Sequence, residues 1–371
     1  MSRSPSTSQR GGALIITLWV AFGLVSLALY FGNAMSLELK SAENRSASME
    51  AGQVCEGAAR YAAYLFNHPD TAGQLPAVSS YSREAVSVGD GVFWFLGRED
   101  AASTPTLPYY SLSDESGKLN LNTATQGMLE LLPRMTPSLA AAILDWRDAD
   151  QDVTAGGAED ETYARQTPPY RAKNGPFESL EELRLVFGMT REILYGEDVN
   201  QNGILDPNEN DGDISPPPDN RDGKLDPGIL EYLTIQTPSV TSNGTTLSLV
   251  NANTASEVVL TCLPGIGKDN AAALVSYRRA HVDELSSPDW FSKAFDGAST
   301  SGATSYLTNS SSFFVADIAA LGQHARGYRR ERFIFDVSTG TARIAARQDL
   351  TSLGWALGRE ARQTALLMKG N

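Results

Sequence analysis

The longest apolar run of the chain lies near its N-terminus, where no charged residue occurs between Arg10 and Glu38. At a rise of about 1.5 Å per residue, about twenty helical residues cover the roughly 30 Å hydrocarbon core of a bilayer. Basic residues precede the run and acidic residues follow it, which predicts a cytoplasmic N-terminus. The apolar spacing continues without a proline until Pro69. We therefore expect one long helix over residues 12–68, with residues 12–34 in the membrane.

An ordinary secretory signal is the alternative interpretation of this start. Gly32-Asn33-Ala34-Met35 is a weak candidate for the small-residue cleavage site that ends such a signal. The helical spacing of apolar residues does not stop there, which favours the long helix.

Period-two patterns and turn signals in two distant parts of the chain predict one small antiparallel sheet. The predicted strands are residues 86–88, 92–95, 109–112, 312–318, 329–337 and 341–345. The sheet would span residues 85–118 and 309–349, with an α-helical domain at 119–308 inserted between strands. The predicted fold class is therefore α+β. The last segment, 350–369, is expected to be partly helical.

The inserted part contains an internal repeat at an offset of 131 residues, with copies at 119–148 and 250–279. Asn120-Leu121-Asn122-Thr123-Ala124 corresponds to Asn251-Ala252-Asn253-Thr254-Ala255, and the agreement continues without a gap. Each copy predicts a capped short helix, a turn that contains proline, and an alanine-rich second helix.

The turn of the second copy resembles a helix-hairpin-helix motif, in which glycines let backbone amides approach a phosphate. This turn consists of Pro264, Gly265, Ile266 and Gly267. Its basic neighbours are Lys268, Arg278 and Arg279. The first copy has Arg134 and Thr136 in place of both glycines. A phosphate-binding hairpin and a purely structural hairpin are the two interpretations, and the expected export favours the structural one.

The formal net charge of −14 and a sequence pI of about 4.7 argue against a nucleic-acid-binding surface. Two cysteines, Cys55 and Cys262, are expected to be small buried residues, with a single disulfide as the less favoured alternative. The three histidines lack paired spacing, which argues against zinc. The sequence shows no metalloprotease helix, phosphate loop or nucleophile motif, so an enzyme is not expected.

Oxygen-bearing side chains recur between residues 198 and 209 with the spacing of a twelve-residue EF-hand loop. Loop positions 1, 3, 5, 9 and 12 are Asp198, Asn200, Asn202, Asp206 and Glu209. Gly203 at position 6 would allow the sharp turn. We expect a structural Ca²⁺ ion here, with plain Asx and Gly turns as the alternative. A weaker loop at 219–226 extends the acidic region to 198–226.

The N-terminus resembles that of type IV prepilins, because a short basic leader and a glycine precede the apolar helix. The resemblance implies that a prepilin peptidase cuts between Gly11 and Gly12, and that the new N-terminus is methylated. Most pilin-like subunits carry glutamate at mature position five, where this chain has Ile16. In such filaments that buried carboxylate would pair with the N-terminal amine of a neighbouring subunit. A subunit that lacks it cannot make this contact with a subunit above it, which suits the tip of a filament. Its absence is typical of the type II secretion minor pseudopilin K (GspK) family.

Further segments resemble the same family, including Leu119-Asn120-Leu121-Asn122 and the stretch from Asp145 to Asp150. The resemblance implies a helical domain inserted into a small pilin-like fold, with calcium bound in that domain. The corresponding acids lie within residues 148–161 and are Asp148, Asp150, Asp152, Glu159 and Asp160. A solvated charged loop is the alternative interpretation of this second cluster.

These observations together predict a minor pseudopilin at the tip of the type II secretion pseudopilus, embedded in a bacterial inner membrane by a single span. Its expected partners are the other minor pseudopilins, the inner-membrane secretion platform and the prepilin peptidase. The alternative is a membrane-anchored DNA receptor of the competence type, which would use the second hairpin. The acidic composition disfavours that alternative.

Overall fold

The computed structural model describes residues 9–81, 85–98, 108–237, 239–242, 245–288, 290–295, 302, 304–358 and 361. Most of the expected leader and half of the segment 350–369 therefore lie outside the described residues.

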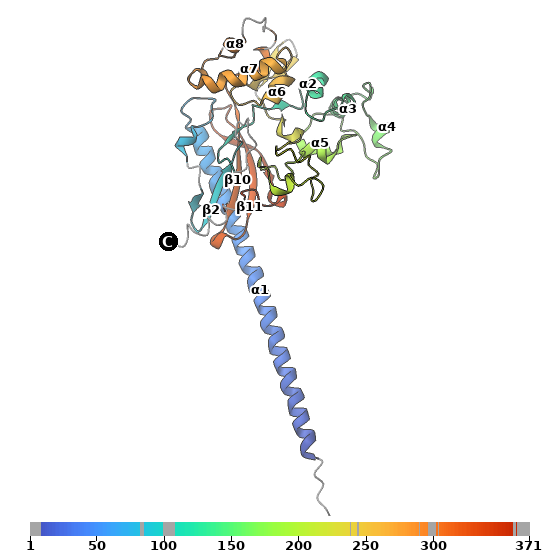
Figure 1. Ribbon diagram of the computed structural model, residues 1–371, viewed down its shortest axis with the longest axis vertical. Helices are drawn as coiled ribbons and strands as arrows, with labels where there is room; N and C mark the ends of the chain where they lie inside the picture. The colour runs from blue at the N-terminus through green and yellow to red at the C-terminus, as the bar shows by residue number, and fades with distance from the viewer. Residues whose placement is uncertain are drawn as a thin grey trace, which may run out of the picture.

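The first element is a single helix, α1 (Gln9–Asn67), that runs for 59 residues, or about 90 Å. The side chains of residues 12–46 are exposed, and one face of the helix is buried from Ala47 onward. Figure 1 shows the first part as a stem and the second part inside a head formed by the rest of the chain. Among the described residues, α1 is the one helix long and apolar enough to cross a membrane. The expected long helix is confirmed.

The head contains an antiparallel sheet with the strand order β1-β2-β10-β11-β12, and β3 also pairs with β10. The strands are β1 (Val86–Val88), β2 (Gly91–Leu96), β3 (Ser113–Asp114), β10 (Phe313–Leu321), β11 (Arg329–Asp336) and β12 (Arg343–Asp349). Strand β10 lies next to β2 although more than 200 residues separate them, so the intervening chain is an insertion between neighbouring strands. The α+β fold class is confirmed.

Two predicted strands are corrected by the structure. Residues 109–112 are not a strand, because only isolated bonds hold them, including one from the Leu112 amide to the Tyr81 hydroxyl at 3.0 Å. The short strand β3 follows them instead. The last strand begins at Arg343 and continues to Asp349, with a bulge opposite Ile334 and Phe335 that shifts its register.

One face of the sheet, here called the front face, packs on α1, and the opposite face is called the back face. The contact joins small side chains of the helix to large side chains of the strands. Cys55, Ala58 and Ala62 of the helix are fully buried, which lets the sheet approach closely. Higher along the helix, Phe66 stacks on Phe314 with ring centroids 5.0 Å apart. Near the base of the head, Gly322 and Gly327 lie against the backbone of Ala47, where a Cβ atom on either glycine would overlap the helix.

The back face of the sheet is covered in two places. The C-terminal segment packs there through Ala356 and Leu357, against Trp94 and Leu321. Beside this apolar patch lies an ion pair between Arg330 and Asp317, both at most 5% exposed. Arg330 donates two hydrogen bonds to the Asp317 carboxylate, at 2.9 and 2.8 Å. A loop of the inserted region covers this pair.

The inserted region, residues 119–308, begins with β4 and ends with β9 and lies beyond the upper end of α1 and to one side of the sheet (Figure 1). Its helices are α2 (Gln126–Glu130), α3 (Pro137–Arg147), α4 (Asp160–Tyr163), α5 (Arg191–Tyr195), α6 (Glu257–Cys262), α7 (Gly267–Ala280) and α8 (Trp290–Ala294). Its strands are β4 (Leu119–Asn120), β5 (Leu233–Thr234), β6 (Ser239–Ser242), β7 (Thr245–Ser248), β8 (Val250–Asn251) and β9 (Leu307–Thr308). One apolar core unites both halves of this region.

The two copies of the repeat have the same internal contacts. In each copy the opening segment forms a short parallel strand pair, β4 with β5 and β8 with β9. An arginine in the last turn of the second helix donates hydrogen bonds back to the opening segment. Arg147 donates to the carbonyls of Leu121 and Ala124, and Arg278 donates to those of Ala252 and Ala255. The repeated sequence therefore specifies a repeated tertiary clamp.

Candidate functional site

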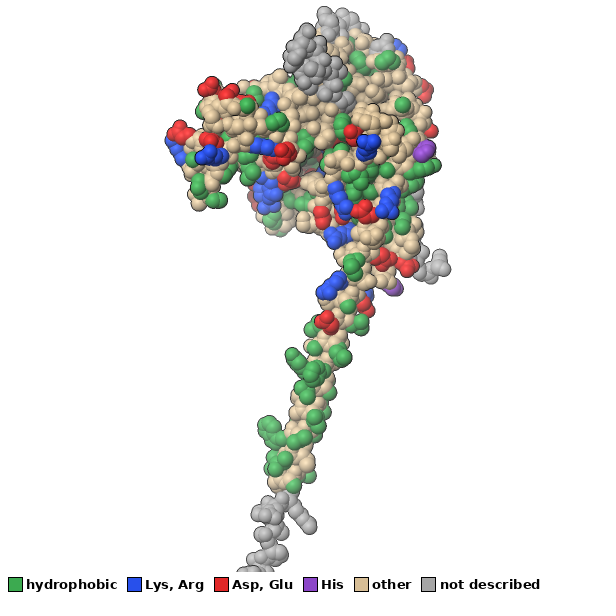
Figure 2. Space-filling view, turned by 180° about the vertical axis from the view of Figure 1, so that it is seen from behind, with side chains coloured by type: hydrophobic (Ala, Val, Ile, Leu, Met, Phe, Trp, Pro, Cys, Tyr) green, Lys and Arg blue, Asp and Glu red, His purple; other side chains and the backbone are tan. Residues whose placement is uncertain are grey.

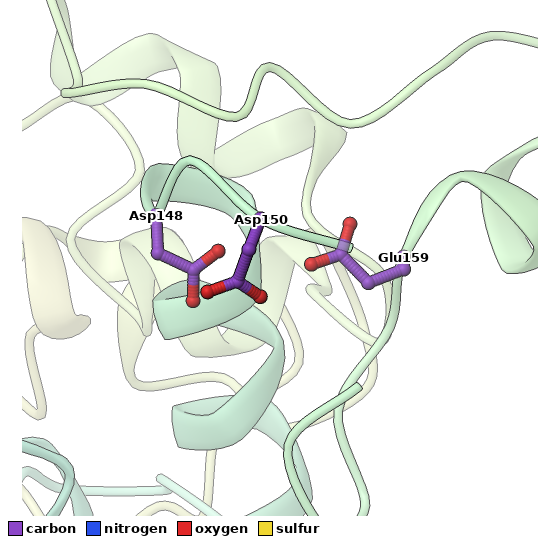
Figure 3. Close-up of side chains that lie close together, drawn as sticks. All are labelled: Asp148, Asp150 and Glu159. Atoms are coloured by element: carbon purple, nitrogen blue, oxygen red, sulfur yellow. The ribbon is translucent and has the colours of Figure 1, made fainter. Parts of the chain in front are cut away.

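Three carboxylates from one side of the inserted region come together after α3. Asp148 and Asp150 follow the C-terminus of α3, and Glu159 directly precedes α4. One carboxylate oxygen from each residue can be chosen so that the three oxygens lie within 4.8 Å of one another. Figure 3 shows the three side chains directed toward a common space.

The Glu159 carboxylate is the unusual member of this cluster. Glu159 is 3% exposed, and both of its carboxylate oxygens are buried without a hydrogen-bond partner. One oxygen of Asp148 is also buried without a partner. Burial, with the nearby charges of Asp145, Asp148 and Asp150, raises the pKa of Glu159 to about 7. Buried acceptors normally have partners, so this arrangement is costly unless a cation satisfies it.

The chemistry of the donors fits calcium. Ca²⁺ takes six to eight oxygen ligands and readily uses clustered carboxylates and amide carbonyls. Asn174 adds a candidate amide oxygen, because its nitrogen donates to the Asp150 carbonyl at 2.8 Å while its own oxygen is buried without a partner. Asn174 is not among the site residues predicted from the sequence, where its only signal is the Asn-Gly pair at a turn.

The other acids of this segment have different roles. The Asp152 amide donates to Asp150 at 2.9 Å, and the Asp160 carboxylate accepts from the Ala172 amide. Asp145, which was not selected as a site residue, is fully buried and accepts from the amides of Thr154 and Ala158. Asp145 therefore fixes the loop that brings Glu159 back to the end of α3.

The EF-hand-like loop has the expected turn, with Gly203 at φ +72°. The Asp198 carboxylate accepts from the amides of Asn202 and Gly203, both at 2.9 Å. Asn200 and Asn202 direct their amide nitrogens at Asp206, at 2.8 and 3.0 Å. These side chains thus already satisfy one another, as the Asx-turn alternative predicts.

Two further features of this loop concern its buried acids. Asp198 lies 3.5 Å from the Arg98 guanidinium. Burial and the charges of Asp198 and Asp206 raise the pKa of Glu209 to about 8, and the Asp206 amide donates to its carboxylate. The weaker loop repeats the same backbone, with Arg221 and Gly223 at positive φ.

The second hairpin places Pro264, Gly265, Ile266 and Gly267 between α6 and α7. Ile266 is buried, and Arg278, selected as a basic neighbour, is 3% exposed and committed to carbonyls of its own repeat. Arg278 is therefore not available to a phosphate at the surface. Cys55 and Cys262 are both buried and free, so the disulfide alternative is wrong.

Along the stem, Gly12 and Ile16 both lie on the exposed part of α1, and Ile16 is 65% exposed. The backbone of Gly11 belongs to the same helix. Figure 2 shows the stem with apolar side chains and charged side chains gathered where it meets the head. An exposed apolar stem of this kind is suited to lipid or to neighbouring helices.

Comparison with known proteins gives a consistent result. Residues 113–195 match the family model for type II secretion system (T2SS), protein K. Type II secretion system protein K of Klebsiella pneumoniae is 44% identical over 57 residues, which are 15% of this chain and 18% of the relative. The corresponding protein of Pseudomonas aeruginosa is 36% identical over 95 residues, or 20% and 28% of the two chains. These matches span less than a third of the relatives' length.

A solved structure extends the likeness over most of the fold. It is the crystal structure of the GspK-GspI-GspJ complex from the type 2 secretion system of enterotoxigenic Escherichia coli. The similarity covers 84% of this chain and 99% of that one, with a TM-score of 0.50 and 14% identity. It shows a shared fold.

Proposed function

We propose that the chain belongs to the type II secretion system protein K family and that it is a minor pseudopilin at the tip of the secretion pseudopilus. The observation that carries the proposal is the family match at residues 113–195. These residues include β3 and the first part of the region inserted into a small sheet, which packs on a long apolar helix. Its role would be structural rather than catalytic. Ile16 supports the place at the tip, because an apolar residue there offers no carboxylate to a subunit above.

The proposed partners are two other minor pseudopilins. The similar solved structure is of a complex of GspK with GspI and GspJ, and the apolar stem of this chain has the surface to pack against the helices of such subunits. Co-purification of the full-length chain with its cognate GspI and GspJ tests this. Recovery of the chain alone under conditions that keep GspI and GspJ together would contradict it.

We also propose that α1 anchors the protein in the inner membrane as a single pass, with the N-terminus in the cytoplasm and the head outside. The secretion platform of that membrane would be the site of assembly. The prepilin peptidase would act on the cytoplasmic side of the span, before the chain enters the pseudopilus.

A direct prediction concerns processing by that peptidase. Co-expression with the peptidase should lower the intact mass by residues 1–11, because the cut would fall before Gly12. Gly11→Val should block the loss, since a branched side chain replaces the glycine at the cut. Gly12→Ala, the matched control, should still be processed. An unchanged mass of the wild-type chain in the presence of active peptidase would contradict the proposed prepilin start.

Calcium is proposed as a structural ion, held by Asp148, Asp150 and Glu159 with Asn174. When bound, Ca²⁺ would neutralise carboxylates that otherwise repel one another at the end of α3. The unpartnered oxygens of Glu159 support this assignment. The loop at 198–209 is a second proposed site, in which the two asparagine amides would have to turn their oxygens toward the ion.

Calcium binding predicts a measurable stabilisation. At a calcium concentration one hundred times the dissociation constant, the folded state should gain about 2.7 kcal/mol, so chelation should lower the melting temperature. Glu159→Gln should remove most of the response, because it deletes a charged ligand, and Asp198→Ala should blunt any part due to the second loop. Glu161→Gln, at a side chain that is 82% exposed, is the control. Identical melting curves with calcium and with chelator would remove the metal proposal.

The competence-type DNA receptor is less well supported. The inserted region, which would have to bind the duplex, carries 28 Asp and Glu residues against 13 Lys and Arg residues. A duplex is itself densely negative, so this surface would repel it. The burial of Arg278 removes one of the few basic groups that the second hairpin could offer.

A further inference from the structure

We propose that residues 198–203 form a latch, in which Arg98, Arg330 and Arg332 hold the inserted region against the back face of the sheet. This conformational device goes beyond the proposed place of the chain in a pseudopilus. It concerns whether the inserted region and the sheet move as one body.

The main acceptors of the latch are backbone carbonyls. The Arg330 guanidinium donates to the carbonyls of Asn200 and Gln201, at 2.5 and 2.6 Å, and its other hydrogen bonds go to the Asp317 carboxylate. Arg98 donates to the Gln201 carbonyl at 3.0 Å, and Arg332 to the Gln201 side chain at 3.2 Å. The three arginines thus converge on two consecutive residues of the inserted region.

The shape of the loop is what presents these carbonyls. Gln201 has φ +54°, an uncommon conformation for a residue with a side chain, and Gly203 has φ +72°. The Asp198 carboxylate holds the turn by accepting from the amides of Asn202 and Gly203, and it also lies 3.5 Å from Arg98. The Asp198 carboxylate therefore both stabilises the turn and forms an ion pair with Arg98, which also binds the loop.

A second contact of Arg98 reinforces the closed position. It donates to both oxygens of Glu231, at 2.9 and 3.2 Å, and Glu231 belongs to the inserted region. Although burial alone would raise the pKa of Glu231, Arg98 and Lys118 hold it below its ordinary value. Arg98 lies two residues after the end of β2, so it links the sheet and the inserted region through both Gln201 and Glu231.

The junction where the chain enters the inserted region supplies the fixed end. Asp114 of β3 accepts from the side chains of Asn251 and Thr254, at 2.7 and 2.6 Å, and from the Ser116 amide. With the latch open, the inserted region would remain tied to the sheet at this junction. It could then rotate about the junction while its own core stayed intact.

Distances between spin labels test the latch in the full-length protein. Labels on Val153→Cys in the inserted region and Ile344→Cys in β12 occupy exposed positions, and both native cysteines are buried. We expect one narrow distance distribution in the parent protein. Arg98→Met should broaden it and add longer distances, while Arg326→Met, which removes an exposed arginine paired with Glu43, should leave it narrow.

A milder variant keeps the test decisive if Arg98→Met does not fold. Gln201→Ala removes only the side-chain contact with Arg332 and should broaden the distribution to a smaller degree. An unchanged distribution in a folded Arg98→Met protein would overturn the latch. Equal broadening in Arg326→Met would also overturn it, because the motion would then not depend on these contacts.

Discussion

Replacing Arg330 by methionine should lower the free energy of unfolding of the full-length protein by about 3 kcal/mol. Arg330 is fully buried and forms two hydrogen bonds with Asp317, so its removal leaves a buried carboxylate with less compensation. Breaking a buried pair generally costs about 3–5 kcal/mol. We expect the lower end, because Arg332 still donates to Asp317 at 2.9 Å. Chemical denaturation in detergent measures the difference.

The control and the pH dependence make this prediction specific. Arg329→Met removes an exposed pair with Asp349 and should cost at most about 1 kcal/mol. Burial opposes the ionised form of Asp317, but Arg330 and Arg332 outweigh it and hold the pKa below its ordinary value. The stability that this carboxylate contributes is therefore present above the ordinary carboxyl pKa and is lost as the pH falls toward the lowered one. Equal costs for both arginine variants would contradict the assignment.

Replacing Gly327 by alanine should lower the free energy of unfolding by about 2–4 kcal/mol. Gly327 has φ +68°, and a Cβ atom there would overlap the backbone of Ala47 in α1. The cost has two parts, a conformational penalty for alanine at positive φ and the displacement of the helix from the sheet. Thermal or chemical unfolding of the full-length protein in detergent measures it.

An alanine substitution at a second glycine distinguishes the conformational penalty from the cost of the overlap. Gly340 has φ +77° in a turn with open space around it, so Gly340→Ala carries the conformational penalty without the overlap. We expect this variant to cost about 1 kcal/mol. If Gly327→Ala costs no more than Gly340→Ala, then the close approach between the sheet and α1 is not what requires glycine at position 327.

The hydrophobic pattern predicted the architecture well, because the longest elements have the strongest periods. The helix up to Asn67 and the strands on both sides of the insertion follow from spacing and turn residues alone. The prediction of a strand at Tyr109 to Leu112 was wrong, because a short run of aromatic and apolar residues fits an irregular segment as well as a strand. Its partner contacts come from distant residues such as Tyr81, which local pattern does not reveal.

The candidate sites were less predictable. Whether their oxygens are free to bind an ion depends on burial and on neighbours from elsewhere in the chain. The loop at 198–209 has the better spacing, yet its side chains satisfy one another, whereas Glu159 in the weaker cluster is buried without partners. Arg278 looked like a basic surface residue and is an internal clamp. Arg330 and Arg332 alternate along β11 as solvent-facing residues would, and only the covering loop makes them interior.

The seating of α1 on Gly322 and Gly327 has a mechanical consequence. At Ala47 the helix backbone lies directly against the backbone of these two glycines, with no side chain between them. Because close-packed backbone cannot readjust as side chains can, this contact resists rotation and sliding of the stem relative to the head. About 50 Å of helix projects below this point, from Gly12 to Arg45. An axial thrust or a torque applied to the exposed end of α1 would therefore pass into the head directly at this contact.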